Sequence, residues 1–152
     1  MSKTIYIGAD HAGYEYKEQL KNFLSKQGYE IIDKGNFIFD KDDDYVDFAH
    51  AVSKEIKNYP EAKGILLCGN AQGVCIVANK LKGIRAITGF DDIEVKTSRT
   101  DDDSNILCLP ARIFPLEKIQ TFVTIWLETD FSQAERHLRR LNKLKDIEEK
   151  LL

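Results

Sequence analysis

The chain has 152 residues, of which 43% are hydrophobic and 31% are charged, with a formal net charge of −3 and three cysteines. A chain of this length fits one domain, which buries about 68–70% of the surface that its unfolded form exposes and needs no disulfides. The net charge argues against nucleic-acid binding, and no apolar run approaches the roughly 20 residues that a membrane span needs.

The cysteine count and the N-terminus indicate a cellular compartment. Three cysteines are an odd number, and they lack the paired spacing typical of a metal site. The stretch Met1–Gly8 lacks the apolar core of a signal peptide. The sequence therefore predicts a cytoplasmic protein with free thiols, no bound metal, and neither a membrane nor a nucleic acid as partner.

The first part of the chain alternates strand-like and helix-like segments. Lys3–Gly8 is predicted as a strand, and a turn at Ala9–Gly13 leads into a helix whose apolar stripe ends at Gly28. Tyr29–Asp33 is predicted as a second strand and is followed by a long polar loop. After that loop, Asp47 is predicted to cap a helix.

A strand, a turn and a helix are predicted within Gly64–Lys80. An unbroken apolar run ends at Cys68, a polar turn lies between Gly69 and Gly73, and an apolar helical segment follows. In an open parallel α/β sheet, ligands bind beyond the carboxyl ends of the strands, where turn amides and a helix N-terminus favour anions. The sequence therefore predicts the functional site in this turn.

Five more elements are predicted in the rest of the chain. They are a strand at Ile84–Ile87, a short helix from Asp91 or Asp92 to about Arg99, a strand at Asn105–Leu109, a helix with Pro115 at its first position, and a helix opened by the capping box Ser132–Glu135. Alternating strands and helices predict an α/β protein, with a parallel sheet covered by helices on both faces. The last helix, at about 133–152, keeps a spaced apolar stripe after that fold is complete. It is expected to pack on a partner subunit, or alternatively on its own domain.

Several side chains near the central turn are candidates for chemistry. A thiol at a helix N-terminus can act as a base or nucleophile when its pKa falls from about 8.5 towards neutrality, which singles out Cys68, although cysteines are also often simply buried. Gly69 and Gly73 bracket amides that could hold a phosphate or a developing oxyanion. Asp10 and His11 are expected at the same edge of the sheet, or else only shape a turn.

Charged residues elsewhere form two further patterns. Arg136 and Arg140 lie four residues apart on one helix face, where two guanidiniums could clamp a phosphate or could simply be solvated. The aspartate runs Asp42–Asp44 and Asp101–Asp103 lack the spacing of a calcium loop. Both runs are expected to be solvated loops.

Several motifs follow one another in the order seen in a known enzyme family. They are Gly8–Glu15, Asp44–Ala49, Gly64–Lys80 with Gly83–Ala86, Asn105–Leu107 and Arg136–Arg140. Together they span nearly the whole chain and resemble the type B ribose-5-phosphate isomerase family, which also contains the galactose-6-phosphate isomerase subunits. The resemblance implies a three-layer α/β/α Rossmann-like fold with a five-stranded parallel sheet. It also implies a homodimer or homotetramer with active sites shared between subunits.

The resemblance further implies a reaction, which is the aldose–ketose isomerisation of a phosphorylated sugar through an enediolate without any cofactor. Ribose 5-phosphate is the first substrate to test. The implied catalytic residues are Cys68 as the base that moves the proton, Asn70, and Asp101. The implied substrate-binding residues are Asp10, His11, Tyr45, Gly69, Ala71, Gln72, Gly73, Asp102, Arg112, Arg136 and Arg140. Of these, His11, Arg136 and Arg140 would bind the phosphate, the arginines reaching it from the partner subunit.

The chain departs from the family pattern at three positions, Asn70, Ala71 and Asp101. Ala71 is expected to cost about 1 kcal/mol or more if its position needs a left-handed backbone, and it could narrow the anion pocket. Asp101 stands where the family has a histidine that assists ring opening. It either remains an acid, because neighbouring carboxylates disfavour its ionisation, or marks an altered substrate. A hexose 6-phosphate isomerase and a catalytically silent phosphosugar-binding subunit therefore remain as alternatives.

Overall fold

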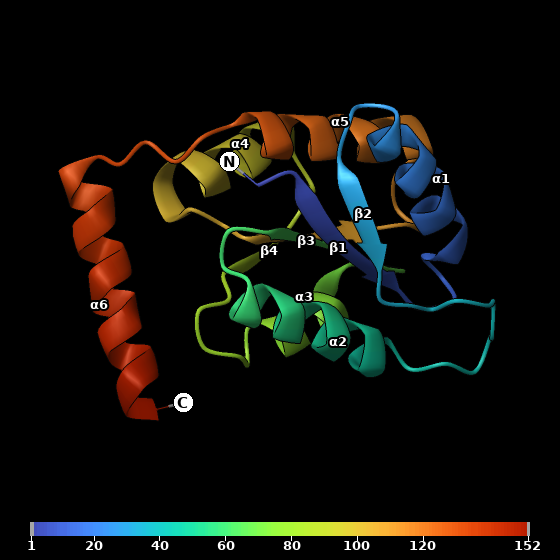
Figure 1. Cartoon of the computed structure of the whole chain (residues 1–152), viewed down its shortest axis with the longest axis horizontal. Helices are drawn as coiled ribbons and strands as arrows, with labels where there is room; N and C mark the ends of the chain where they lie inside the picture. The colour runs from blue at the N-terminus through green and yellow to red at the C-terminus, as the bar shows by residue number, and fades with distance from the viewer. Residues whose placement is uncertain (1, 152) are drawn as a thin grey trace.

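The computed structural model describes residues 2–151 and has three layers, with helices on both faces of one sheet (Figure 1). The strands are β1 (Thr4–Ala9), β2 (Glu30–Asp33), β3 (Lys63–Cys68), β4 (Ala86–Thr88) and β5 (Ile106–Pro110). The helices are α1 (Tyr14–Ser25), α2 (Tyr45–Asn58), α3 (Gln72–Ala78), α4 (Asp92–Asp102), α5 (Leu116–Glu128) and α6 (Glu135–Leu151). The predicted α/β fold is confirmed. Residues 1 and 152, which the predicted domain and last helix include, lie outside the described range.

The sheet is parallel throughout, in the strand order β2-β1-β3-β5-β4. β2 lies on one side of β1, whereas β3, β5 and β4 lie on its other side. The strand order therefore reverses between β1 and β3. In open α/β sheets, ligands bind in the crevice beyond the carboxyl ends of the strands at such a switch point. The topology points to the carboxyl ends of β1 and β3 as the place for a site.

Two apolar cores cover the two faces of the sheet. Because successive side chains on a strand point to opposite faces, β3 sends Ile65 and Leu67 into one core and Leu66 and Cys68 into the other. Helices α1, α4 and α5 cover the first core, and α2 and α3 cover the second (Figure 1). Burial on both faces explains why the central strands β1, β3 and β5 are largely apolar.

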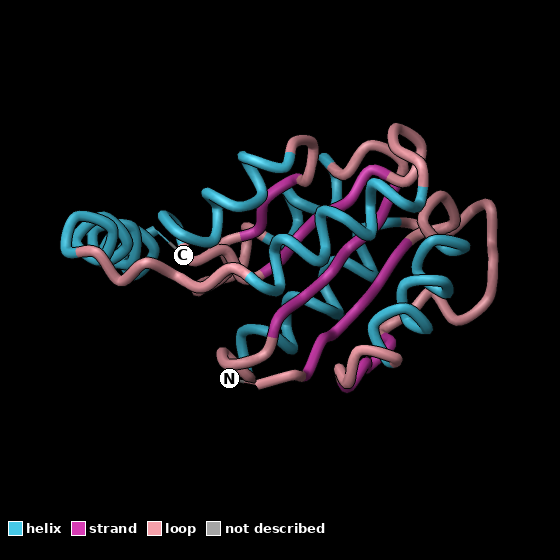
Figure 2. The backbone as a smooth tube through the Cα atoms, turned by 90° about the horizontal axis from the view of Figure 1, so that it is seen from above, coloured by secondary structure: helices cyan, strands magenta, loops and turns pink. Residues whose placement is uncertain are grey.

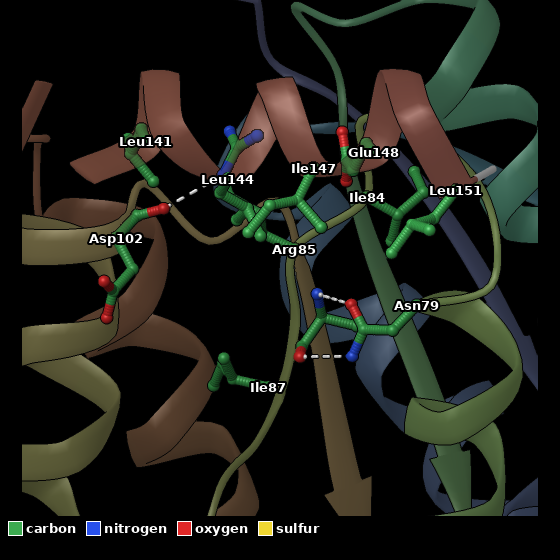
Figure 3. Close-up of a pocket in the computed structure, with 11 residues that line it drawn as sticks. Asn79, Ile84, Arg85, Ile87, Asp102, Leu141, Leu144, Ile147, Glu148 and Leu151 are labelled. Atoms are coloured by element: carbon green, nitrogen blue, oxygen red, sulfur yellow. Dashed lines mark hydrogen bonds between the residues drawn. The ribbon is translucent and has the colours of Figure 1, made fainter. Parts of the chain in front are cut away.

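Helix α6 stands apart from the three layers, after an extended segment (Figures 1 and 2). Within the described part of α6, His137 is the one buried residue, whereas the apolar side chains of Leu138, Leu144 and Ile147 are exposed. An open groove of about 490 Å³ lies between α6 and the β4 edge, lined mainly by apolar side chains from both (Figure 3). The stripe on α6 is therefore only partly covered by its own domain.

None of the helices in residues 2–151 has the length and apolar character that a bilayer crossing needs.

Two predicted boundaries were wrong, the end of helix α4 and the start of strand β4. Helix α4 continues to Asp102 rather than ending near Arg99, because the Arg99 guanidinium donates to the Asp103 carboxylate at 2.8 Å and Asp103 takes the left-handed conformation after the helix. Strand β4 starts later than predicted, since the Arg85 amide donates to the Asn105 side chain at 2.7 Å.

The predicted helix starts were also only partly right. Asp44, and not Asp47, precedes the first residue of α2, and Pro115 lies just before α5 rather than within it. Asp91 is confirmed as the cap of α4, because its carboxylate accepts from two amides of the first turn. Ser132 does not form the predicted capping box. Its hydroxyl instead accepts from the Ala134 amide and pairs with His137 Nδ1 at 2.8 Å.

Four charged side chains form a network that joins α1 to β2. Lys17, which is fully buried, lies 2.6 Å from an Asp33 oxygen, and Lys21 lies 2.8 Å from the same atom. Glu18 pairs with both lysines. Burial raises the pKa of Asp33, but the hydrogen bonds from Lys17 and Lys21 outweigh burial and hold that pKa below its ordinary value.

We expect Asp33→Asn to lower the free energy of unfolding by about 3 kcal/mol at pH 7, because buried Lys17 loses its best anion. A carboxyl with a lowered pKa in the folded state stabilises the fold above its unfolded pKa of about 3.8, and this stability is lost as the pH falls through the folded pKa. The variant should therefore lose less stability below pH 4 than the wild type. Urea unfolding at pH 7 and pH 3.5 measures both effects. Glu61→Gln, at an exposed position, is the control.

Candidate active site

A pocket of about 280 Å³ lies beyond the carboxyl ends of β1 and β3, where the strand order reverses. It is lined by Asp10, Tyr45, Cys68, Gly69, Asn70, Gly73, Arg112 and Ile113. Seven of these eight residues are among those that the sequence singled out. The structure thus brings the central turn, the Asp10 turn and the segment after β5 to one place.

Cys68 is the last residue of β3 and borders this pocket, although only 4% of its surface is exposed. The segment after β5 runs alongside it, because the Ala111 amide donates to the Cys68 carbonyl at 2.9 Å and the Arg112 amide donates to the Gly69 carbonyl at 3.0 Å. The Arg112 side chain then lies over Gly69, where a Cβ would come within 3.2 Å of it. Arg112 and Cys68 therefore line the same pocket.

The turn after Cys68 has a left-handed residue at Ala71, with φ 68°. A left-handed backbone was the condition under which Ala71 was expected to cost about 1 kcal/mol or more, and the structure meets that condition. Ala71 is buried in the core that α2 and α3 cover and is not among the residues that line the pocket. The Gln72 amide donates to Asn70 Oδ1 at 3.1 Å. Gly73 and Val74 also lie in the first turn of α3, where backbone amides have no partner within the helix.

Gly73 lets the Tyr45 ring close one side of the pocket. A Cβ at Gly73 would lie 2.6 Å from Tyr45 Cε2 and 2.7 Å from Cζ, so Gly73→Ala must displace the ring. We expect this variant to raise KM about tenfold, because small shifts of substrate-positioning groups are costly. Steady-state kinetics measures the change. Gly83→Ala, which has no atom within 4 Å of its Cβ and lies outside the pocket, should lower stability through its positive φ and leave KM unchanged.

Asp10 and His11 follow β1 at the predicted edge of the sheet, where Asp10 also shapes the turn. Asp10 Oδ1 accepts from the amides of Ala12 and Gly13 at 3.0 and 3.3 Å, and Asp10 also lines the pocket. Burial raises the pKa of Asp10, although these amides lower it. His11 Nδ1 lies 2.8 Å from Asp43 Oδ1. Potential ligand atoms of Asp10, His11 and Asp43 all lie within 4.8 Å of one another.

The remaining candidate residues form a second group, which we call the α4–α6 cluster and which consists of Asp101, Asp102, Arg136 and Arg140. Helix α4 ends just before β5 begins, so the cluster lies at the amino edge of the sheet, opposite Cys68. Arg136 and Arg140 are exposed and form no ion pair within residues 2–151. One chain therefore does not bring the cluster and the pocket together.

The positions of Asp101, Asp43 and His137 in the structure were not predicted from the sequence. Asp101 lies in α4 rather than in a loop, with Oδ1 3.6 Å from His137 Nε2. His137 was not singled out, but its spacing of four residues from Leu141 placed it on the apolar face of α6. Asp43 was expected to be solvated, whereas its side chain is 9% exposed and bonded to His11. A run of three aspartates gives no signal for this burial.

The chain is similar to known proteins along most of its length. The family model described as Ribose/Galactose Isomerase matches residues 5–144. The chain is 37% identical to the probable ribose-5-phosphate isomerase B of Mycoplasma pneumoniae, over 95% of this chain and 94% of that protein. It is 32% identical to ribose-5-phosphate isomerase B of Escherichia coli, over 97% and 98% of the two chains.

Solved structures of proteins named ribose-5-phosphate isomerase B also superpose on the chain. Ribose-5-phosphate isomerase B from Mycoplasma genitalium with bound ribulose-5-phosphate gives a TM-score of 0.93 at 33% identity, covering 96% of each chain. The enzyme from Clostridium thermocellum gives a TM-score of 0.93 at 38% identity, covering 98% of this chain and 99% of the other. With a family model over most of its length and relatives above 30% identity, the chain belongs to the ribose/galactose isomerase family.

Proposed function

We propose that this chain is an isomerase that interconverts ribose 5-phosphate and ribulose 5-phosphate. The observation that carries the proposal is the placement of Cys68 on a pocket with Asp10 and Arg112, in a member of this family. The choice of a pentose is supported by the names of the relatives and by the ribulose-5-phosphate in the Mycoplasma genitalium structure.

Cys68 acts as the base. The thiolate removes the proton from carbon 2 of the open-chain aldose, which gives an enediolate. The proton of the 2-hydroxyl moves to the oxygen on carbon 1, and the same sulfur returns a proton to carbon 1 to give the ketose. Asn70 and the Gly73 amide lie in the adjacent turn, where they stabilise the negative oxygen of the intermediate. Each such preorganised donor contributes about 3–4 kcal/mol to the stability of the transition state. No covalent bond forms between the substrate and the protein during these steps.

The phosphate is bound by cations from two subunits. His11 and Arg112 belong to the same chain as Cys68, whereas Arg136 and Arg140 come from the α4–α6 cluster of a second subunit. Three features support a dimer, or a pair of dimers, with shared sites. The two groups lie at opposite edges of the sheet, the apolar stripe of α6 is exposed, and an apolar groove runs beside that helix (Figure 3).

Isomerisation in heavy water tests the proposal. The purified protein should convert ribose 5-phosphate to the ketose, and aldose formed in the reverse direction should carry deuterium at carbon 2. Galactose 6-phosphate and allose 6-phosphate serve as comparison substrates, and faster turnover of either one would reassign the substrate. Binding of every sugar phosphate without conversion or exchange would identify a silent subunit instead.

Asp101→His tests the role of the residue that replaces the family's histidine. We expect turnover of ribose 5-phosphate, which is mainly a closed ring, to rise up to about tenfold, because an imidazole donates a proton at neutral pH more readily than an ionised carboxylate. Ribulose 5-phosphate has no closed ring to open, since its 5-hydroxyl is esterified. Its exchange of the carbon 1 proton with solvent should therefore hardly change. Equal effects on both reactions would exclude a ring-opening role for residue 101.

A further inference from the structure

The loop between β2 and α2 places a carboxylate behind His11. Asp43 Oδ1 accepts from the His11 backbone amide at 2.9 Å and lies 2.8 Å from His11 Nδ1. The second oxygen, Oδ2, accepts from the Asn36 side-chain amide at 3.1 Å. Within residues 2–151, Asp43 has no lysine or arginine partner, and its side chain is 9% exposed. Among the residues that the structure describes, His11 is therefore the one group in contact with Asp43 that can carry a positive charge.

These contacts determine which ring atom of His11 remains available. An ionised carboxylate only accepts hydrogen bonds, so Nδ1 carries a proton that it donates to Asp43. The ring of Phe39 packs edge-on against His11 with centroids 6.4 Å apart and holds the imidazole from another side. Nε2 is left as the ring nitrogen that can reach a ligand. His11 follows Asp10, which lines the Cys68 pocket.

The contact between Asn36 and Asp43 leaves a buried oxygen of Asn36 without a hydrogen bond. Asn36 is 3% exposed, and its Oδ1 is a buried side-chain atom with no hydrogen-bond partner among the described residues. Turning the amide over would set two acceptors, Asn36 Oδ1 and Asp43 Oδ2, against each other. The observed orientation instead satisfies Asp43 and leaves the Asn36 oxygen unpaired, which is unfavourable for a buried group.

We propose that Asp43 is a positioning residue for the phosphate of the substrate, acting through His11. It holds the imidazole by Nδ1, so that the protonated ring donates from Nε2 to a phosphate oxygen while the carboxylate balances its charge. The proposal deepens the proposed function, because it assumes that His11 meets the phosphate of a sugar phosphate in this pocket. It assigns a role to a loop residue that belongs to neither the turn after β3 nor the α4–α6 cluster.

The test compares Asp43→Ala with Asp43→Asn. Loss of the anchor should raise KM for ribose 5-phosphate and the inhibition constant of inorganic phosphate by about tenfold, equivalent to about 1.4 kcal/mol, with kcat changed less than about threefold. Asp43→Asn keeps an acceptor for Nδ1–H, so it should recover part of the affinity. The exposed neighbour Asp42 supplies the control variant Asp42→Ala, which should match the wild type.

Two further measurements separate positioning from a general structural role. If Asp43 acts through His11, Asp43→Ala should add nothing to the KM defect of His11→Gln, because the two substitutions remove the same interaction. Nitrogen NMR of the His11 ring in the protein without substrate should show that the Nδ1 proton is lost from its hydrogen bond in Asp43→Ala. Additive defects in KM, or a fall in kcat with KM unchanged, would overturn the proposal.

Two further outcomes distinguish the positioning role of Asp43 from failure of the proposed function and from a metal site. Binding of inorganic phosphate, measured by calorimetry, does not require turnover. A wild type that fails to isomerise any sugar would therefore disprove the proposed function and still leave the inference testable. If EDTA abolishes phosphate binding and a divalent cation restores it, Asp10, His11 and Asp43 hold a metal, and the positioning role is wrong.

Discussion

Cys68→Ser should lower kcat for ribose 5-phosphate by about 10²–10⁴, the usual contribution of a positioned acid or base. A serine hydroxyl has nearly the size of the thiol but does not ionise near neutral pH, so it cannot remove the carbon 2 proton. Sugar phosphate binding should be largely preserved, because the substitution leaves Arg112 and His11 in place. Initial rates, deuterium incorporation and calorimetric binding measure the three quantities separately.

The other cysteines provide the control for this experiment. Cys75, on α3, donates from its sulfur to the Ala86 carbonyl at 3.3 Å and does not line the pocket. A serine can donate the same hydrogen bond, so Cys75→Ser should retain wild-type turnover. Burial raises the pKa of Cys108 well above its ordinary value, so this thiol should stay protonated. Retention of most activity in Cys68→Ser would remove Cys68 from the mechanism.

A mixture of two inactive variants should regain activity if the sites are shared. Arg136→Ala/Arg140→Ala is expected to lower kcat/KM by about 10²–10³, from the loss of two charge-assisted contacts to phosphate. Cys68→Ser is inactive for a different reason. After the two proteins are unfolded together and refolded, half of the dimers are mixed, and each mixed dimer has one site with both Cys68 and the arginines. Activity should therefore return to about a quarter of the wild-type value.

A second mixture controls for effects of refolding. Arg112 belongs to the same pocket as Cys68, so mixing Arg112→Ala with Cys68→Ser creates no intact site and should restore nothing. Recovery in the first mixture alone supports sharing between subunits. Absence of recovery in both, with dimers present by sedimentation, would place the arginines in a different role.

Much of the fold could be predicted because local patterns and tertiary packing agree. Apolar runs such as that ending at Cys68 are buried on both faces of the sheet, so strand positions follow directly from the sequence. For Ala71, the sequence predicts strain on the condition that the backbone there is left-handed. The structure meets this condition with φ 68°.

Most residues that line the Cys68 pocket could be named from the sequence. Asp101 precedes β5 and Cys68 ends β3, so a parallel sheet already places them at opposite edges, and only the family resemblance assigned them to one site. Asp43 was missed for a different reason. Its burial comes from contacts with His11 and Asn36, which belong to other segments, and local polarity carries no information about them.

The separation of α6 from both cores has a consequence for how this protein would lose activity. A helix that adds little to the packing of its own sheet can be weakened without unfolding the subunit. In the proposed dimer, the charges that this helix carries would reach a substrate only while the two subunits remain associated. Dilution below the dissociation constant of the proposed dimer should therefore silence the enzyme while its circular dichroism stays constant. Substitutions of Leu144 or Ile147 by polar residues should move this threshold to higher protein concentration.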